Sequence, residues 1–193
     1  MTSNVIKTAW DAILAKHSAL FVGHEPVALK QDAAPLYKQL LEMMAADNTT
    51  KRRQSPLVNA GYAARIAVIT SAVSSFLLLD GVARTDLRLV VLGAGLDTLG
   101  LWARSLVVSP RALEVIEVDT LEICRAKKEI VVSQKLVLEK NEPEGSTVLT
   151  GKIQLPSKRS NTDNRADYFL CACDLRDLGS VKQCLSSFTD KPK

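Results

Sequence analysis

The feature that most constrains the fold is the stretch Leu87–Asp97, in which a short apolar run ends at two glycines. Leu89–Leu92 is continuously apolar, which is typical of a strand buried on both faces. Gly93-Ala-Gly95 follows, and the apolar segment from there to Leu106 can form a helix. A strand, a glycine turn and a helix open a nucleotide-binding α/β unit, because glycine adopts positive φ and lets a ligand lie against the backbone.

Taken alone, this turn is a weak signal, since the dinucleotide-binding pattern has a third glycine where this chain has Thr98, and a glycine pair often marks only a turn. The context strengthens it. Leu113–Val118 is predicted to be the second strand, and Asp119 closes it about 20 residues after the glycines. A carboxylate there can bind both hydroxyls of a ribose, which favours a ligand that contains adenosine. Asp119 also fits the first position of a capping box with Glu122, and the two roles can coexist.

The composition describes an ordinary globular chain. Its 193 residues suggest one domain with an N-terminal extension, and 47% of them are hydrophobic. The net charge of +4 is spread over interspersed basic and acidic residues, which does not indicate nucleic acid. The longest apolar stretch, Ala67–Leu79, is too short to span a bilayer, and no secretory signal is recognised. We therefore expect a soluble, cytoplasmic protein.

The four cysteines and two histidines do not suggest a metal site. Cys171 and Cys173 lie in a strand-like run, and their side chains are expected on opposite faces, which would oppose a shared metal and a mutual disulfide. Without a secretory signal, buried thiols in a reducing compartment are expected. His17 and His24 both precede the α/β region, and zinc patterns and phosphate-loop lysines are absent from the sequence.

Three helices are predicted before the glycine turn. The first spans Val5–Leu20, the second runs from near Pro35 to before Asp47, and the third opens with Asn59–Arg65 and continues as an apolar face. Lys16 lies late in the first helix, where the plain interpretation is a cation near a helix C-terminus. Arg65 lies beside the apolar face, and such an arginine usually extends to water.

After the second strand, a helix to about Val132 gives a βαβα order, which favours a parallel sheet with right-handed crossovers. The residues from Glu139 to Asn164 form a polar, irregular segment, with a short strand at Thr147–Leu149. Tyr168–Cys173 is predicted to be the third core strand, and a short helix at Ser180–Phe188 ends the chain.

Asp174 directly follows the third predicted strand. Because the carboxyl ends of parallel strands meet at one sheet edge, Gly93, Asp119 and Asp174 are expected to lie together. The alternative for Asp174 and Asp177 is helix capping together with a surface ion pair to Arg176.

Together these residues give the chain a resemblance to the leucine carboxyl methyltransferases, a branch of the class I S-adenosylmethionine-dependent methyltransferases. Five stretches carry it in order: Lys16 in Ala-Lys-His-Ser-Ala, Asn59–Arg65, Leu92–Asp97, Glu117–Asp119 and Asp174–Leu178. The resemblance implies an α/β fold with the parallel, Rossmann-like sheet of a class I methyltransferase, here incomplete. It divides the chain into an N-terminal helical extension at 1–85 and a partial S-adenosylmethionine-binding domain at 86–193.

The resemblance implies methyl transfer from S-adenosyl-L-methionine to the C-terminal leucine carboxylate of the type 2A protein phosphatase catalytic subunit. A carboxylate is already a nucleophile at neutral pH, so no general base is needed. The protein must instead align the carboxylate with the methyl group, and such alignment contributes about 7–11 kcal/mol in well-oriented systems. The resemblance implies that Lys16 and Arg65 bind the methionine carboxylate of the cofactor and that Gly93 contacts the cofactor through its backbone. It also implies that Asp119 binds the ribose hydroxyls and that Asp174 and Leu175 contact the adenine.

Three alternatives stay open. A sister branch that helps to make wybutosine in phenylalanine tRNA is similar at Leu149–Gly151 and Ala166–Tyr168. A non-catalytic binding or regulatory module is the second, and a nicotinamide-binding domain, disfavoured by Thr98, is the third. Family members continue into a further strand that would follow Lys193, so this chain is expected to bind the cofactor weakly and to have little activity.

Overall fold

The computed structural model describes residues 3–21, 34–45, 54–78, 87–107, 113–139, 148–153 and 167–189. Three helices come first: α1 (Asn4–Phe21), α2 (Ala34–Ala45) and α3 (Pro56–Leu77). The remaining elements are β1 (Leu87–Leu92), α4 (Leu99–Leu106), β2 (Leu113–Asp119), α5 (Leu121–Ser133), β3 (Val137–Glu139), β4 (Val148–Ile153), β5 (Asp167–Ala172) and α6 (Leu178–Thr189).

The strands form one five-stranded sheet in the order β1-β2-β5-β4-β3. β1, β2 and β5 are parallel, so the predicted α/β fold with three parallel core strands is confirmed. β4 runs antiparallel to β5, and β3 runs antiparallel to β4. The sequence predicted only a short strand near residues 147–149 here, because the polar composition after Glu139 concealed the β3–β4 pair.

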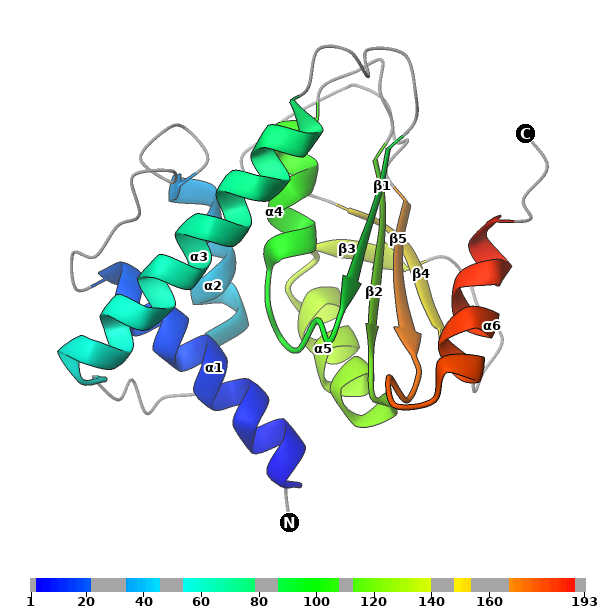
Figure 1. Cartoon of the computed structure of the whole chain (residues 1–193), viewed down its shortest axis with the longest axis horizontal. Helices are drawn as coiled ribbons and strands as arrows, with labels where there is room; N and C mark the ends of the chain where they lie inside the picture. Colours follow the sequence, from blue (N-terminus) through cyan, green and yellow to red (C-terminus); the bar gives the residue numbers. More distant parts are fainter. Residues whose placement is uncertain are drawn as a thin grey trace.

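The sheet has helices on both faces, as Figure 1 shows: α6 covers one face, and the other five helices lie on the opposite side. Residues of β5 alternate between the two layers, as strand geometry requires. Tyr168 and Leu170 belong to the large core beneath α4 and α5, whereas Phe169 packs with Phe188 of α6 in a smaller core. The Phe169 and Phe188 rings lie 4.8 Å apart between their centroids.

The same alternation corrects the expectation about the cysteines. Cys171 and Cys173 both lie in the smaller core under α6, with Cys184 of α6 packed against it. Residues two apart on a strand share a face, so the expectation of opposite faces was wrong. All four cysteines fall within the described ranges and are thiols rather than disulfides.

α3 begins earlier than predicted. Ser55 is its N-cap, and the Ser55 side chain accepts a hydrogen bond from the Val58 backbone N–H at 3.4 Å. Pro56, three residues before the predicted opening at Asn59, is the first helical residue, a position that suits proline because its missing N–H has no partner there.

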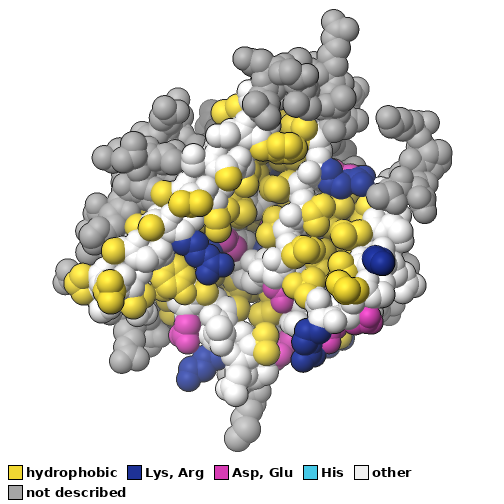
Figure 2. All heavy atoms as spheres, viewed as in Figure 1, with side chains coloured by type: hydrophobic (Ala, Val, Ile, Leu, Met, Phe, Trp, Pro, Cys, Tyr) yellow, Lys and Arg dark blue, Asp and Glu magenta, His cyan; other side chains and the backbone are white. Residues whose placement is uncertain are grey.

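The outer surface of α3 is unusually apolar. Figure 2 shows hydrophobic side chains gathered along α3 and near β1, and Val68, Phe76, Val90 and Leu92 are each more than one third exposed. By length and composition alone, α3 could cross a membrane, and 22% of the 18-residue window that passes this test is buried inside the protein. One such helix is weak evidence, since a packing helix of a soluble protein can pass the same test.

The N-terminal helices pack onto the α/β part through one continuous core. Ile13 of α1 and Leu40 of α2 belong to the same buried cluster as Leu101 of α4 and Val115 of β2. This packing brings α1 close to the loop that follows β1 and to α5. The division of the chain near residue 85 stays a prediction.

Candidate functional site

The turn after β1 has the backbone conformation for which glycine is suited. Gly93 and Gly95 have φ angles of 67° and 56°, in the left-handed region that side chains disfavour. The Gly93 N–H donates to the Val118 carbonyl at 2.8 Å, and the Gly95 N–H donates to Asp119 Oδ2 at 2.7 Å. Two N–H groups of the turn therefore bind the end of β2, one at a backbone carbonyl and the other at the Asp119 carboxylate.

Asp119 ends β2 and is buried, with 9% of its surface exposed. Besides the Gly95 bond, its Oδ1 accepts the Thr120 N–H at 2.7 Å. The N-cap of α5 is Thr120, so the capping-box interpretation of Asp119 was wrong; Asp119 itself still belongs to the strand. A carboxylate has about four acceptor positions, which leaves room for ligand hydroxyls.

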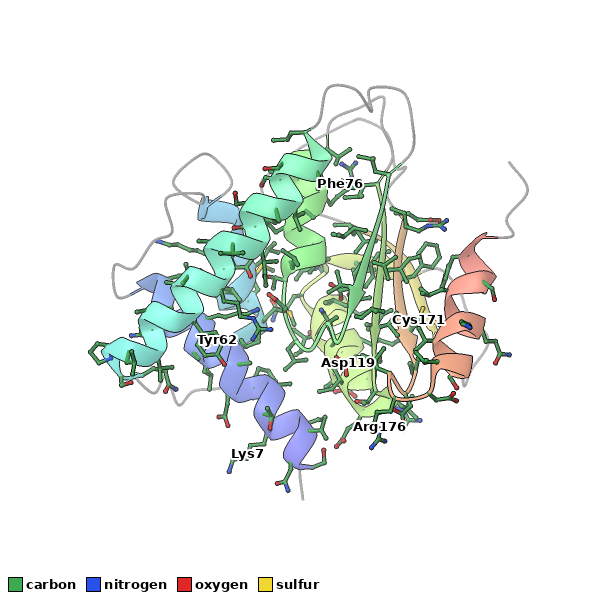
Figure 3. All side chains as sticks on the ribbon, in the orientation of Figure 1. Lys7, Tyr62, Phe76, Asp119, Cys171 and Arg176 are labelled. Atoms are coloured by element: carbon green, nitrogen blue, oxygen red, sulfur yellow. The ribbon has the colours of Figure 1, made fainter. Side chains whose placement is uncertain are left out.

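The segment after β5 reaches the same edge of the sheet. The Cys173 N–H donates to the Asp119 carbonyl at 2.8 Å, and Leu175 Cδ1 lies 3.7 Å from the position that a Cβ on Gly93 would take. Figure 3 shows Asp119 and Arg176 near this same end of the sheet. The expected convergence of Gly93, Asp119 and Asp174 at one edge is thus confirmed.

Asp174 is exposed and has a local partner. Its carboxylate accepts from the Arg176 guanidinium at 2.8–2.9 Å and from the Arg176 N–H at 3.0 Å. These bonds lower the pKa of Asp174 to about 2. Asp177 caps α6 through the Gly179 N–H at 2.9 Å and the Ser180 hydroxyl at 2.6 Å. Both contacts of the alternative interpretation are therefore present: Asp177 caps a helix, and Asp174 forms a surface ion pair with Arg176.

Lys16 is tied to the glycine turn rather than to a helix terminus. It is buried in α1, which continues to Phe21, and its Nζ forms an ion pair with Asp97 of the loop after β1. The Tyr37 hydroxyl of α2 donates to the other oxygen of the same carboxylate at 2.9 Å. Asp97 thereby connects two N-terminal helices to the sheet edge.

Arg65 is not joined to this group. It is exposed on α3, and it forms no hydrogen bond or ion pair with the other residues that the structure describes. Figure 3 shows Tyr62 where α3 crosses α1, and residues three apart on a helix share a face, so Arg65 lies close to this crossing. The structure brings together five of the six predicted site residues, and Arg65 of α3 forms no hydrogen bond or ion pair with these five.

A buried ionic network under the turn was missed by the sequence analysis. Lys127 Nζ of α5 lies 2.6 Å from Glu117 Oε2 of β2 and donates to the Asp97 carbonyl at 2.6 Å. The Tyr168 hydroxyl donates to Glu117 Oε2 at 2.5 Å, and burial followed by the Glu117 charge raises the pKa of Tyr168. The available signal was Glu117 itself, because a charged residue inside a buried strand requires a partner.

Gly100 was missed as well. A Cβ at this position in α4 would lie 2.6 Å from both Glu117 Oε1 and Val115 Cγ1. The third glycine of the dinucleotide-binding pattern allows a helix to pack closely on a strand. Gly100 performs that task here, two residues after Thr98.

Within the described ranges, no group of three or more His, Cys, Asp or Glu side chains could hold a metal ion. A search among curated proteins found no match. A protein-family model described as leucine carboxyl methyltransferase matches residues 5–187, nearly the whole chain.

Proposed function

Because the chain belongs to the leucine carboxyl methyltransferase family, we propose that its methyl acceptor is the C-terminal leucine carboxylate of the type 2A protein phosphatase catalytic subunit. Family membership itself supports the broader activity, a carboxyl methyltransferase of a family that generally uses S-adenosylmethionine. We also propose a cytoplasmic location, in keeping with four cysteines that are thiols.

The observation that supports a cofactor site is the convergence at the sheet edge. Gly93 offers a backbone without a side chain, Asp119 offers a carboxylate held by Gly95, and Leu175 offers an apolar surface beside Gly93. These groups suit the backbone contact, the ribose hydroxyls and the adenine of S-adenosylmethionine, in that order. Lys16 supplies a buried cation for the carboxylate of the methionine part.

The residues act by binding and orientation. When bound, the cofactor supplies an electrophilic methyl group on its sulfonium. Asp119 and the turn fix the nucleoside, and Lys16 fixes the opposite end, so the methyl group has one direction of approach. The acceptor carboxylate needs no proton removed at neutral pH, so its alignment is the main contribution required of the protein.

The proposal is tested by binding and by transfer. Calorimetric titration with S-adenosylhomocysteine, from micromolar to millimolar ligand, should give a saturable signal that Asp119→Asn weakens by at least about tenfold, since a hydrogen bond to a charged group is worth about 1.5–3 kcal/mol. Asp11→Asn is the matched control, because it removes the same charge from an exposed site on α1. Absence of binding at millimolar ligand would contradict the proposal.

The acceptor is tested with labelled S-adenosylmethionine. We expect label on the phosphatase catalytic subunit and none on a subunit that lacks its terminal leucine. The sister activity on tRNA is the second candidate, because the two stretches that resemble that branch meet in the sheet, where Gly151 lies opposite Tyr168. Label on phenylalanine tRNA alone would favour it. Ligand binding without transfer to either acceptor would favour a non-catalytic module.

A further inference from the structure

Asp97 gathers more contacts than any role assigned so far explains. One of its carboxylate oxygens pairs with Lys16 Nζ, and the other accepts the Tyr37 hydroxyl at 2.9 Å and the Thr98 N–H at 2.7 Å. Burial acts to raise the pKa of Asp97, but the charge and hydrogen bond of Lys16 outweigh it, so the pKa lies below its usual value. Asp97 is therefore a carboxylate at neutral pH.

The main chain of Asp97 is held as firmly as its side chain. Lys127, which is fully buried, donates to the Asp97 carbonyl at 2.6 Å and is itself held by Glu117 at 2.6 Å. Two residues earlier, the Gly95 N–H is bound to Asp119. The position of the Asp97 carboxylate is thus fixed relative to the glycine turn.

Tyr37 is fixed too. Its ring is buried and meets Trp102 edge-on, with 5.8 Å between the ring centroids. Burial, followed by the charge of Asp97, raises the pKa of Tyr37, so the hydroxyl keeps its proton and donates. An ammonium group has three donors, and among the residues that the structure describes Asp97 engages one of those of Lys16, which leaves two for another partner.

We propose that Asp97, supported by Tyr37, is a positioning residue that holds the Lys16 ammonium beside the glycine turn to receive the carboxylate of the cofactor's amino-acid part. This inference rests on the proposed function. A free lysine side chain loses much of its rotamer freedom when it binds a ligand. The Asp97 contact orders Lys16 during folding, so ligand binding does not have to order it.

The test compares two ligands that differ only at the amino-acid end. S-adenosylhomocysteine has the carboxylate and the amino group of the amino-acid part, and 5′-methylthioadenosine keeps the nucleoside and sulfur but lacks both groups. Ligand-observed NMR titrations on the whole chain measure both affinities. We expect Asp97→Asn to weaken the affinity for S-adenosylhomocysteine by at least about tenfold, as for loss of a charged hydrogen bond. The affinity for 5′-methylthioadenosine should change by less than about twofold.

Tyr37→Phe provides a second, milder variant, since it removes one hydroxyl and keeps the ring against Trp102. This variant should weaken the affinity for S-adenosylhomocysteine by about 2- to 10-fold and leave the affinity for 5′-methylthioadenosine unchanged. Asp119→Asn is the contrast, because it should weaken both ligands to a similar extent.

Each outcome is decisive. If Asp97→Asn weakens both ligands equally, or weakens neither, Asp97 serves only the fold and the inference is wrong, while the proposed function stands. If Asp97→Asn fails to fold by circular dichroism, Tyr37→Phe decides by the same comparison. If the wild-type chain binds neither ligand at millimolar concentration, the proposed function fails and the inference fails with it.

Discussion

At the scale of single residues, Gly100 is the described glycine that leaves the least space for a side chain. A methyl group there would lie 2.6 Å from Val115 and Glu117, both buried in β2. We expect Gly100→Ala to lower the free energy of unfolding by about 1–3 kcal/mol, as overpacking usually does, despite the higher helix propensity of alanine. Urea denaturation followed by circular dichroism measures this change in the free energy of unfolding.

Gly61 is the matched control for that substitution. It lies in α3, is exposed, and would place a Cβ with no atom within 4 Å. Gly61→Ala should therefore raise the free energy of unfolding by about 0.5–1 kcal/mol. Equal effects of the two substitutions would show that close packing at Gly100 is not limiting.

Asp97 also gives the stability of the protein a pH dependence. Its pKa in the folded chain is lower than the usual 3.8, so the unfolded chain binds the proton more tightly. The stabilisation is complete above the unfolded pKa and is lost as the pH falls through the folded pKa. We expect Asp97→Asn to flatten the acid limb of a plot of unfolding free energy against pH, between about pH 5 and pH 2.

The wild-type slope in that range should be steeper by up to about 1.4 kcal/mol per pH unit, the value for one proton. Parallel acid limbs for wild type and Asp97→Asn would contradict the assignment. Asp11→Asn, on the exposed surface of α1, should leave the limb nearly unchanged.

At the scale of elements, the thiols buried on the two faces of the sheet should react slowly: Cys124 of α5 lies in the large core, and Cys171 and Cys173 lie in the small core under α6. Burial, followed by the Asp119 charge, raises the pKa of Cys124 to about 12, and burial with the neighbouring Cys184 raises the pKa of Cys171. Since the thiolate is the reactive form, a disulfide reagent at pH 8 should label at most one thiol quickly in the native chain. We assign that thiol to Cys184, which is half-buried.

The control for this assignment is simple. Cys184→Ser should abolish the fast phase, and denaturation in urea should expose all four thiols in the wild type. Fast labelling of Cys171 in the native chain would mean that α6 opens readily from the sheet.

Most elements could be predicted because their signals are local. The apolar run before Gly93 and the spacing to Asp119 are visible in the sequence, and both lie where they were expected. The β3–β4 pair could not be predicted, because β3 spans only three residues and its pairing depends on β4, which begins nine residues after β3 ends. Pairing of that kind has no periodicity to detect.

The candidate site was predicted in part for the same reason. Glycines at the turn and an acid at the strand end follow from chain geometry, but the Lys16–Asp97 pair joins residues 81 positions apart. No local pattern indicates which acid a buried lysine will meet. Lys127 was overlooked as one of several charged residues on an amphipathic helix, and only the fold shows that it points inward.

At the scale of the whole molecule, the continuous core predicts a single unfolding transition. Trp102 is buried in it, and Trp10 of α1 packs against it from the N-terminal side. Fluorescence from the two tryptophans should therefore change over the same range of urea concentrations as the circular dichroism signal. Trp10→Phe leaves Trp102 as the only tryptophan; a midpoint for it that differs from the circular dichroism midpoint of the same variant would show that the helices and sheet unfold separately.

The bond from the Gly95 N–H to Asp119 joins the loop after β1 to the end of β2 through the chain's own groups. Because this bond needs no other molecule to form it, we expect the loop to keep its shape when a nucleoside arrives. Asp119 can accept new hydroxyl groups while it keeps Gly95, and ligand release would leave the turn as it was. The site is expected to fill and empty many times with little movement of the backbone around it.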